Sequence, residues 1–207
     1  MSEPYLLATR SLGKLSELRP MFSAAGLDVI DLDAAGIAES ADEAGLEEFE
    51  TFEENALSKA KYFRARSGLV TIADDSGLEV QALGGAPGVR TKRWSGRTDL
   101  EGRALDVANN EFLLRKLESS ADRRARYVCV AALVDGSGDR TFRGETEGEI
   151  LDAPRGDGGF GYDPLFLSSD LGITFAEAER AVKERSSHRG RAFSQLIAWL
   201  AQRARSH

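Results

Sequence analysis

The first 32 residues alternate between short apolar segments and one amphipathic segment, and this alternation restricts the fold more than any other feature. Residues 5–9 and 28–32 are apolar enough to form buried strands. Between them, apolar side chains recur at helical spacing until Gly26, and they are Leu15, Leu18, Phe22 and Ala25. A strand, a helix and a strand in this order predict an α/β unit with a right-handed crossover.

Two later helices are expected to begin with a threonine followed three residues later by a glutamate, the pattern of a capping box. The first starts at Thr51 with Glu54, and the second starts at Thr98 with Glu101. The first helix presents an apolar stripe of Phe52, Ala56, Ala60 and Phe63, with Lys59 on or beside it. The second presents Ala104, Leu105, Ala108, Phe112 and Leu117.

The second half of the chain is expected to contain a pair of strands and two more helices. Residues 125–134 and 139–150 have the pattern of strands joined by a tight turn. A helix is expected over residues 175–184, and another carries Phe193, Leu196, Ile197 and Leu200. Because no repeat and no long linker divides the sequence, we expect one domain over residues 1–207.

Composition narrows the classes of partner. The formal net charge is -7, whereas a protein that coats a polynucleotide is usually basic. An anionic ligand therefore needs local cations or a metal ion. No apolar segment approaches the roughly 20 residues that span a bilayer, and residues 1–4 lack the basic region of a signal peptide. We expect a cytoplasmic protein with no membrane and no polynucleotide partner.

Two adjacent carboxylates, Asp74 and Asp75, follow the apolar run of residues 69–73. We expect them at the end of a core strand, where α/β proteins usually build their sites. A carboxylate beside a core needs a partner, a metal or water. Together with Glu54 they offer the oxygen ligands that Mg²⁺ prefers. Glu54 has an alternative role as the capping residue of its helix, and the sequence leaves the two roles open.

The segment from Thr9 to Lys14 joins the first strand to the first helix. A helix N-terminus offers free N–H groups that suit phosphate, and Thr9, Ser11 and Lys14 add donors. The spacing is not that of a Walker A loop. The alternative is a plain N-cap at Ser11 and a solvated lysine at Lys14.

Two further segments carry ligand-binding residue types. Phe160 is surrounded by glycines in the loop of residues 156–164, so a flat ligand can stack on its ring, although such an aromatic also often returns to the core. Lys183 and residues 187–189 place several hydrogen-bond donors at a helix break.

Six motifs in order resemble the inosine triphosphate pyrophosphatase family, also called the Ham1-like or RdgB-like family. They are Leu7-Ala8-Thr9 with Gly13-Lys14, Thr51 to Ala56 with Lys59-Ala60, Ile72 to Leu78, Leu83 to Val89, Gly158 to Pro164, and Ser187 to Gly190. The resemblance implies an α/β fold with a long central mixed sheet flanked by helices and two lobes with an active-site cleft between them. It also implies a homodimer and Mg²⁺-dependent hydrolysis of ITP, dITP and XTP to the monophosphate and pyrophosphate.

The resemblance also implies residue roles. Asp75 is the expected proton acceptor, and Glu54 and Asp75 are the expected metal ligands. The expected substrate-binding residues are Thr9, Arg10, Ser11, Gly13, Lys14, Lys59, Ser76, Phe160, Gly161, Tyr162, Asp163, Lys183, His188 and Arg189. Asp74 is expected to tune the pKa of Asp75 or to be structural.

The chain departs from the family pattern in two places. Ser11 replaces the usual asparagine, and Arg10 before it is a candidate to replace the lost phosphate contact. The acidic stretch before Thr51 is longer than usual, so Glu43 is hard to align with the family and is kept as a weak alternative metal ligand. Residues 39–50 as a whole have the composition of a solvated loop.

Two other functions remain open from the sequence. A Maf-like nucleotide pyrophosphatase shares the phosphate-binding logic, but the motifs around Phe160 and His188 argue against it. A nucleotide-binding sensor without catalysis is favoured only by Ser11 and is disfavoured by Glu54, Lys59 and Asp75.

Overall fold

The strand–helix–strand opening is present in the computed structural model, which describes residues 3–205. β1 (Tyr5–Leu7) leads through α1 (Leu12–Ala24) to β2 (Val29–Asp31), which pairs with β1 in parallel. On its other side β1 pairs in parallel with β3 (Thr71–Val80), with Leu6 opposite Thr71. The expected α/β unit is therefore confirmed.

The sheet has six strands in the order β2-β1-β3-β4-β5-β6. β4 (Arg124–Val134) and β5 (Asp139–Ile150) are the two expected strands of the second half, and β6 (Phe166–Ser168) pairs with β5 in antiparallel orientation. Since parallel and antiparallel pairs occur together, the sheet is mixed, as predicted.

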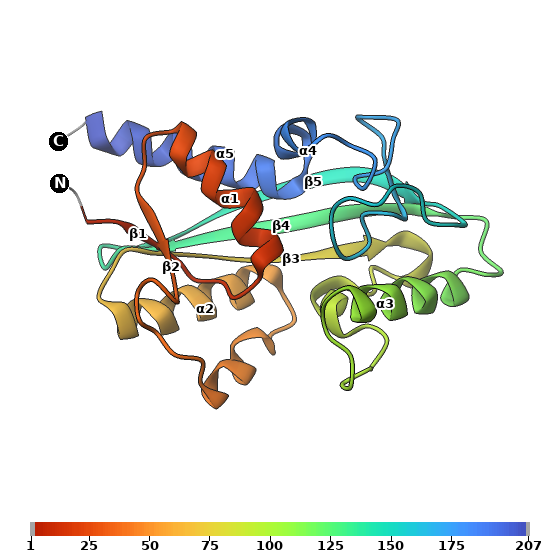
Figure 1. Cartoon of the computed structure of the whole chain (residues 1–207), viewed down its shortest axis with the longest axis horizontal. Helices are drawn as coiled ribbons and strands as arrows, with labels where there is room; N and C mark the ends of the chain where they lie inside the picture. Colours follow the sequence, from red (N-terminus) through yellow and green to blue (C-terminus); the bar gives the residue numbers. More distant parts are fainter. Residues whose placement is uncertain (1–2, 206–207) are drawn as a thin grey trace. The chain divides into compact units, whose positions relative to one another are not determined.

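Four more α-helices and three short 3₁₀ helices complete the described part of the chain (Figure 1). The α-helices are α2 (Phe52–Ser67), α3 (Gly102–Lys116), α4 (Arg180–Ser186) and α5 (His188–Arg205). The 3₁₀ helices are η1 (Ala41–Glu47), η2 (Gln81–Leu83) and η3 (Gly88–Arg93). Within residues 3–205, none of these helices combines the length and apolarity that crossing a membrane requires.

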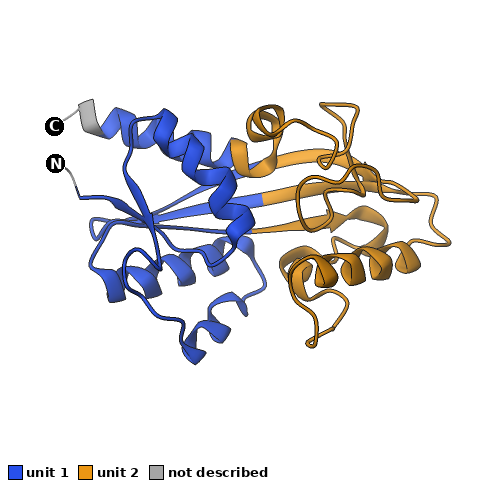
Figure 2. Ribbon diagram, viewed as in Figure 1, with its two compact units in different colours: residues 1–75, 129–144, 191–207 blue, residues 76–128, 145–190 orange. Residues whose placement is uncertain are grey.

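The chain divides into two compact units, coloured separately in Figure 2. Unit 1 comprises residues 1–75, 129–144 and 191–207, and unit 2 comprises residues 76–128 and 145–190. β3, β4 and β5 each contribute residues to both units, and in β3 the boundary falls between Asp75 and Ser76. The predicted single domain with a cleft between two lobes stays a prediction.

In unit 1, α1 and α5 cover one face of the strands and α2 covers the other (Figure 1). The first face packs Phe22 of α1 and Phe193 of α5 edge to face, over Ile72 and Cys129 of the sheet. The second face receives the predicted stripe of α2, and its buried side chains include Phe52, Ala56, Lys59, Ala60 and Phe63. Lys59 thus enters the interior with the apolar stripe.

The core of unit 2 is built from strand residues and long loops, with one contribution from α3. Tyr127 of β4 packs against Phe166 and Phe175, and Leu113 joins this cluster from α3. The prediction for α3 was wrong in two respects. The helix begins after Glu101 rather than at Thr98. Of the expected face only Leu117, directly after the helix, is buried, and within the helix Asn109 and Leu113 are buried instead. Asn109 is buried because its amide bonds the backbone of Ser95 and Lys92.

Candidate active site

The two central carboxylates lie within a strand and not at its end, which corrects the expectation from the sequence. β3 runs without interruption from Thr71 to Val80, so Asp74 and Asp75 occupy its middle. Neighbouring side chains of a strand point to opposite faces. Asp74 therefore faces the side of α1, where Lys14 and Cys129 contact it, and Asp75 faces the side of α2, where Asn55 contacts it.

The backbone of β3 becomes accessible to side chains at Asp74. The neighbouring strand β1 ends at Leu7, and just beyond it the Ala8 N–H donates to the Ile72 carbonyl at 2.7 Å. At Asp74, two lysines replace the missing strand. The carbonyl oxygen of Asp74 accepts hydrogen bonds from Lys59 Nζ at 2.8 Å and from Lys14 Nζ at 3.3 Å.

The Asp74 carboxylate is buried and paired within unit 1. Its residue is 1% exposed, its Oδ2 lies 3.0 Å from Lys14 Nζ, and the Cys129 thiol donates to the same oxygen at 3.7 Å. Lys14 is therefore held in place by Asp74, and the alternative of a solvated first-turn lysine was wrong. A buried carboxylate with this partner is costly to disturb, because removing Lys14 would leave an uncompensated charge.

The Asp75 carboxylate is buried on the opposite face. Its Oδ2 accepts a hydrogen bond from Asn55 Nδ2 at 3.0 Å, and Asn55 in turn exchanges two hydrogen bonds with the backbone of Phe49. Burial raises the pKa of Asp75 above its ordinary value, against the opposing attraction of Lys59 and Lys14. This places a carboxyl group with increased proton affinity beside two cations, a combination common at functional sites.

Glu47 joins this cluster, although it was not among the residues predicted from the sequence. Its carboxylate forms an ion pair with Lys59 Nζ. Burial acts to raise the pKa of Glu47, but the charges of Lys59 and Lys14 outweigh it and the pKa lies below its ordinary value. Burial likewise acts to lower the pKa of Lys59, and Glu47, Asp74 and Asp75 reverse this effect. In the sequence, no local pattern distinguishes Glu47 from the other acidic residues of the 39–50 stretch.

Glu54 occupies the capping position, which was its alternative role in the prediction from sequence. Its carboxylate accepts a hydrogen bond from the Thr51 hydroxyl at 2.7 Å, and the Thr51 oxygen accepts from the Glu54 N–H at 3.2 Å. The residue is exposed. The role of Glu54 as a metal ligand stays a prediction, and this geometry favours Glu47 over it.

The donor set around Asp75 fits a hard divalent cation. Lys59 Nζ pairs with Glu47 and also donates to the carbonyl oxygen of Asp74, so one ammonium group links Glu47 to the Asp74–Asp75 segment. Among residues 3–205, no group of three or more acidic, histidine or cysteine side chains is arranged to enclose a metal by itself. Mg²⁺ tolerates such a site, since it commonly binds one or two carboxylates and completes its shell with water and phosphate oxygens.

The expected phosphate segment starts the helix that carries Lys14. Ser11 is the N-cap of α1 and accepts a hydrogen bond from the Lys14 N–H at 3.4 Å, while the Ser11 N–H donates to Thr9 Oγ1 at 3.2 Å. The plain N-cap role of Ser11 is thus present. The first turn of α1, including Gly13, presents backbone N–H groups and the positive end of the helix dipole, which favour an anion.

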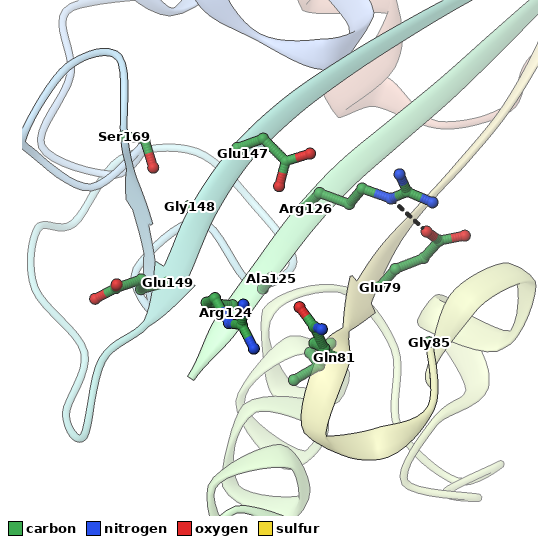
Figure 3. Close-up of a pocket in the computed structure, with 11 residues that line it drawn as sticks. Glu79, Gln81, Gly85, Arg124, Ala125, Arg126, Glu147, Gly148, Glu149 and Ser169 are labelled. Atoms are coloured by element: carbon green, nitrogen blue, oxygen red, sulfur yellow. Dashed lines mark hydrogen bonds and ion pairs between the residues drawn. The ribbon is translucent and has the colours of Figure 1, made fainter. Parts of the chain in front are cut away.

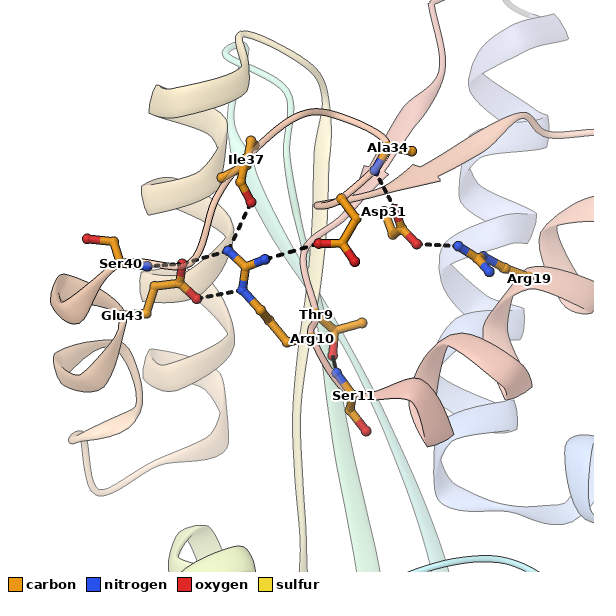
Figure 4. A network of polar contacts seen from close by, with 10 residues as sticks. Thr9, Arg10, Ser11, Arg19, Asp31, Ala34, Ile37, Ser40 and Glu43 are labelled. Atoms are coloured by element: carbon orange, nitrogen blue, oxygen red, sulfur yellow. Dashed lines mark hydrogen bonds and ion pairs between the residues drawn. The ribbon is translucent and has the colours of Figure 1, made fainter. Parts of the chain in front are cut away.

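Arg10 points away from this helix terminus and into a polar network (Figure 4). Its guanidinium donates to both carboxylate oxygens of Glu43, from Nε at 3.0 Å and from Nη2 at 2.8 Å. Nη2 also donates to the Ile37 carbonyl at 3.1 Å, and Nη1 lies 3.5 Å from an oxygen of Asp33. The hydrogen bond from Arg10 is the main cause of the lowered pKa of Glu43. Both the phosphate role of Arg10 and the metal role of Glu43 stay predictions that these contacts do not favour.

A second cluster forms in unit 2 around Asp163. The Asp163 Oδ2 accepts from Lys183 Nζ at 2.6 Å and from the Phe160 N–H at 2.8 Å, and both charged side chains are buried. Lys183 Nζ also lies 5.1 Å from the centre of the Phe160 ring. The carboxylate thus fixes the cation and the aromatic residue together.

The residues after the helix break belong to the same unit and lie close to this cluster. Arg189 donates to the Ser76 hydroxyl at 2.8 Å, and its guanidinium lies 5.6 Å from the Phe160 ring. The His188 ring is buried and stacks on Tyr127 with a centroid distance of 4.5 Å. A charged donor and an oriented imidazole therefore join Lys183.

Tyr162 and Gly161 contribute differently from Phe160. Tyr162 is 1% exposed and its hydroxyl donates to the Thr91 carbonyl at 2.9 Å, so its ring serves the core of unit 2 and is not presented to a ligand. The Gly161 peptide is held by two side chains of α3. Its N–H donates to Asp106 Oδ2 at 2.8 Å, and its carbonyl accepts from Asn110 Nδ2 at 3.1 Å. The sequence analysis missed both α3 residues, because their role depends on a contact about 50 residues away in sequence.

Two glycines of the expected motifs are required by close approach. A Cβ at Gly159, which has a φ of 70°, would lie 2.1 Å from Asp163 Oδ2. A Cβ at Gly190 would lie 1.6 Å from the Glu184 carbonyl oxygen. Any larger residue at either position would displace the Asp163 or the α4–α5 contacts.

A separate hollow of about 550 Å³ lies on the strands of unit 2 (Figure 3). It is lined by charged side chains that include Glu79, Arg126 and Glu147, and none of the expected site residues lines it. Arg126 bonds Glu79 at 2.7 Å and Glu145 at 3.3 Å, so its charge is already compensated. The residues that line this hollow belong neither to the cluster around Asp75 nor to the cluster around Asp163.

Comparison with known proteins decides the family. The model of the Ham1 family matches residues 5–199. The chain belongs to the Ham1 family. It is 46% identical to the dITP/XTP pyrophosphatase of Mycolicibacterium paratuberculosis over 98% of both chains. It is also 46% identical to the dITP/XTP pyrophosphatase of Burkholderia pseudomallei, over 95% of this chain and 93% of that protein.

Solved structures of Ham1 proteins share the fold. The Staphylococcus aureus Ham1 protein superposes with a TM-score of 0.82 at 35% identity, covering 97% of this chain and 100% of that chain. The HAM1 protein of Coxiella burnetii gives a TM-score of 0.84 at 33% identity, with the same coverage. The resemblance inferred from the six motifs is confirmed.

The contacts of α3 with Gly161 generate a prediction. Asn110→Ala removes the donor to the Gly161 carbonyl, and a typical hydrogen bond contributes about 0.5–1.5 kcal/mol. We expect faster amide exchange in residues 158–163, measured by hydrogen–deuterium exchange mass spectrometry. Val107→Ala is the matched control, because Val107 is 49% exposed on the same helix. Unchanged exchange in Asn110→Ala would show that α3 does not hold this loop.

Proposed function

We propose that this Ham1-family protein hydrolyses non-standard purine nucleoside triphosphates, such as dITP, ITP and XTP, to the monophosphate and pyrophosphate. The observation that carries the proposal is the cluster of Asp75, Glu47, Lys14 and Lys59 beside the N-terminus of α1. It combines carboxylates for a divalent cation with ammonium groups and helix N–H groups for phosphate. The relatives named dITP/XTP pyrophosphatase support this substrate class.

We infer that the required cation is Mg²⁺ and that Asp75 and Glu47 would hold it. Mg²⁺ bound there would polarise the phosphate oxygens and help to organise the attacking water. The hydrogen bond from Asn55 positions the Asp75 carboxylate as the group that would accept the proton of that water. Water then attacks the α-phosphorus and pyrophosphate leaves.

Lys14 and Lys59 would stabilise the charge of the triphosphate. Both ammonium groups are fixed on the Asp74 carbonyl, so they need little reorganisation when the substrate binds. Thr9, Ser11 and Gly13 would add hydroxyl and backbone donors at the start of α1. Asp74 then acts mainly by holding Lys14, and burial rather than Asp74 is the leading cause of the raised pKa of Asp75.

The unit 2 cluster would select the base. Hypoxanthine and xanthine carry a keto oxygen at C6, which accepts a hydrogen bond, whereas adenine carries an amino donor there. Lys183, His188 and Arg189 supply donors, and the Phe160 ring offers a stacking surface that adds affinity without much selectivity. Guanine shares the keto group, so its 2-amino group would have to be rejected by steric or desolvation cost.

The remaining expectations extend the same proposal. We propose one domain over residues 1–207 that acts as a homodimer in the cytoplasm, without a membrane or polynucleotide partner. The resemblance of the motifs supports the homodimer, and the acidic net charge of -7 disfavours polynucleotide binding.

A substrate panel tests the function. We expect Mg²⁺-dependent pyrophosphate release from ITP, dITP and XTP, with kcat/KM for ATP and GTP lower by roughly 10- to 100-fold. This ratio corresponds to the cost of about 1–3 kcal/mol for a buried polar group without its partner. Equal rates on GTP and ITP would contradict the proposal, and preferred cleavage of dTTP or UTP would favour the Maf-like alternative. Binding of ITP without turnover would favour a sensor.

The choice of metal ligand can be tested by matched glutamate variants. Glu47→Gln should raise the Mg²⁺ concentration at half-maximal rate by roughly tenfold or more, because one charged ligand is lost. Glu54→Gln should leave that concentration near the wild-type value, since Glu54 serves the cap of α2. The opposite pattern would restore Glu54 as the ligand.

The role of Asp75 as proton acceptor predicts a kinetic effect. Asp75→Asn keeps the size of the side chain but cannot take up the proton, so kcat should fall by roughly 10²-fold or more. Thermal unfolding of the variant controls for folding. Near-normal turnover at saturating Mg²⁺ and substrate would remove Asp75 from the mechanism.

A further inference from the structure

The 3₁₀ helix η1 carries Glu47 to the site, but it packs only shallowly on the rest of unit 1. None of its seven residues is buried. Leu46 is only half-buried, so apolar packing holds η1 weakly and its polar contacts become important for its position. Glu47 is the last residue of η1, so any displacement of this helix moves the carboxylate relative to Lys59.

Arg10 and Glu43 form a well-shielded polar contact between η1 and the segment that leads into α1. The two side chains are 27% and 15% exposed and meet in a bidentate arrangement at 2.8 and 3.0 Å. By contrast, Arg66 and Asp42 meet at 3.5 Å with side chains that are 40% and 72% exposed. Exposed single contacts of that kind contribute little, whereas forked guanidinium–carboxylate pairs fix both distance and orientation.

Glu43 is also fixed within η1. Its Oε1 accepts from the Ser40 N–H at 3.1 Å, and the Ser40 hydroxyl accepts from the Asp42 N–H at 3.3 Å, which forms a capping box. Arg10 therefore holds the start of the helix through a side chain that is itself rigid. On the other side, Arg10 lies directly between Thr9 and Ser11, at the start of the phosphate segment.

We propose that the Arg10–Glu43 pair is a latch that sets the position of Glu47 relative to the phosphate segment of residues 9–14. Arg10 and Glu43 are positioning residues and do not contact the substrate. The latch gives Arg10 a role different from the phosphate contact expected from the sequence. This inference rests on the proposed function for its kinetic consequence, but the latch itself is a property of unit 1.

The test compares Arg10→Lys, Glu43→Gln and the double variant. Lysine keeps the charge of Arg10 and loses the fork, and glutamine keeps the shape of Glu43 and loses the charge. Each single variant should raise the Mg²⁺ concentration at half-maximal XTP hydrolysis by roughly 10- to 100-fold, the scale typical of residues that orient metal ligands. kcat at saturating Mg²⁺ should stay near the wild-type value, and the double variant should be no worse than either single one.

Arg19→Lys is the matched control. Arg19 pairs with Asp31 elsewhere in unit 1, outside η1, and Figure 4 shows both pairs. Its Mg²⁺ dependence should equal that of the wild type. Hydrogen–deuterium exchange of residues 41–47 gives a readout independent of activity, and it should accelerate in Arg10→Lys and Glu43→Gln only.

Two outcomes would overturn the latch. Unchanged exchange of residues 41–47 in both variants would show that the pair does not hold η1. A higher KM for nucleotide in Arg10→Lys, with wild-type Mg²⁺ dependence in Glu43→Gln, would instead make Arg10 a phosphate ligand. If the wild type hydrolyses none of the purine substrates, the proposed function fails, while the exchange experiment still decides the latch.

Discussion

The early end of β1 is the constraint on which the candidate phosphate site depends. After Leu7 the chain leaves the sheet, so the Asp74 carbonyl of β3 receives hydrogen bonds from Lys59 and Lys14 instead of from a strand. A buried carbonyl requires such donors. The need to satisfy the backbone of β3 thus fixes two ammonium groups, one from each helix that flanks the strand, where a polyanion could be bound.

The sequence predicted most of this arrangement because its signals are local. Strand and helix periodicities identified the α/β fold, and they placed Lys59 on or beside the apolar stripe that α2 buries. The end of β3 was misplaced because two aspartates interrupt the apolar run, and their burial depends on lysines that are 15 and 60 residues away. Tertiary contacts override the local pattern there.

Glu47 and the α3 residues illustrate what local patterns leave out. Glu47 lies in an acidic stretch whose composition is that of a solvated loop, and only the contact with Lys59 distinguishes it. Asp106 and Asn110 follow helical spacing like any exposed pair, and their partner is a single glycine far away in sequence. For Glu54 the local pattern was sufficient, because it predicted the cap with Thr51 that the structure contains. The family resemblance had instead implied that Glu54 is a metal ligand.

The charge balance of the unit 1 cluster bears on the form in which a substrate binds. Three carboxylates, Asp74, Asp75 and Glu47, stand against two ammonium groups, so the cluster carries an excess of one negative charge when all are ionised. The protein as a whole also has a net charge of -7. A free triphosphate would be repelled by the local negative charge of the cluster and by the net negative charge of the protein. A triphosphate complexed with a divalent cation would bring positive charge to Asp75 and Glu47. The cluster therefore favours the metal-complexed nucleotide, and its lysines then bind the phosphate oxygens that the cation leaves uncompensated.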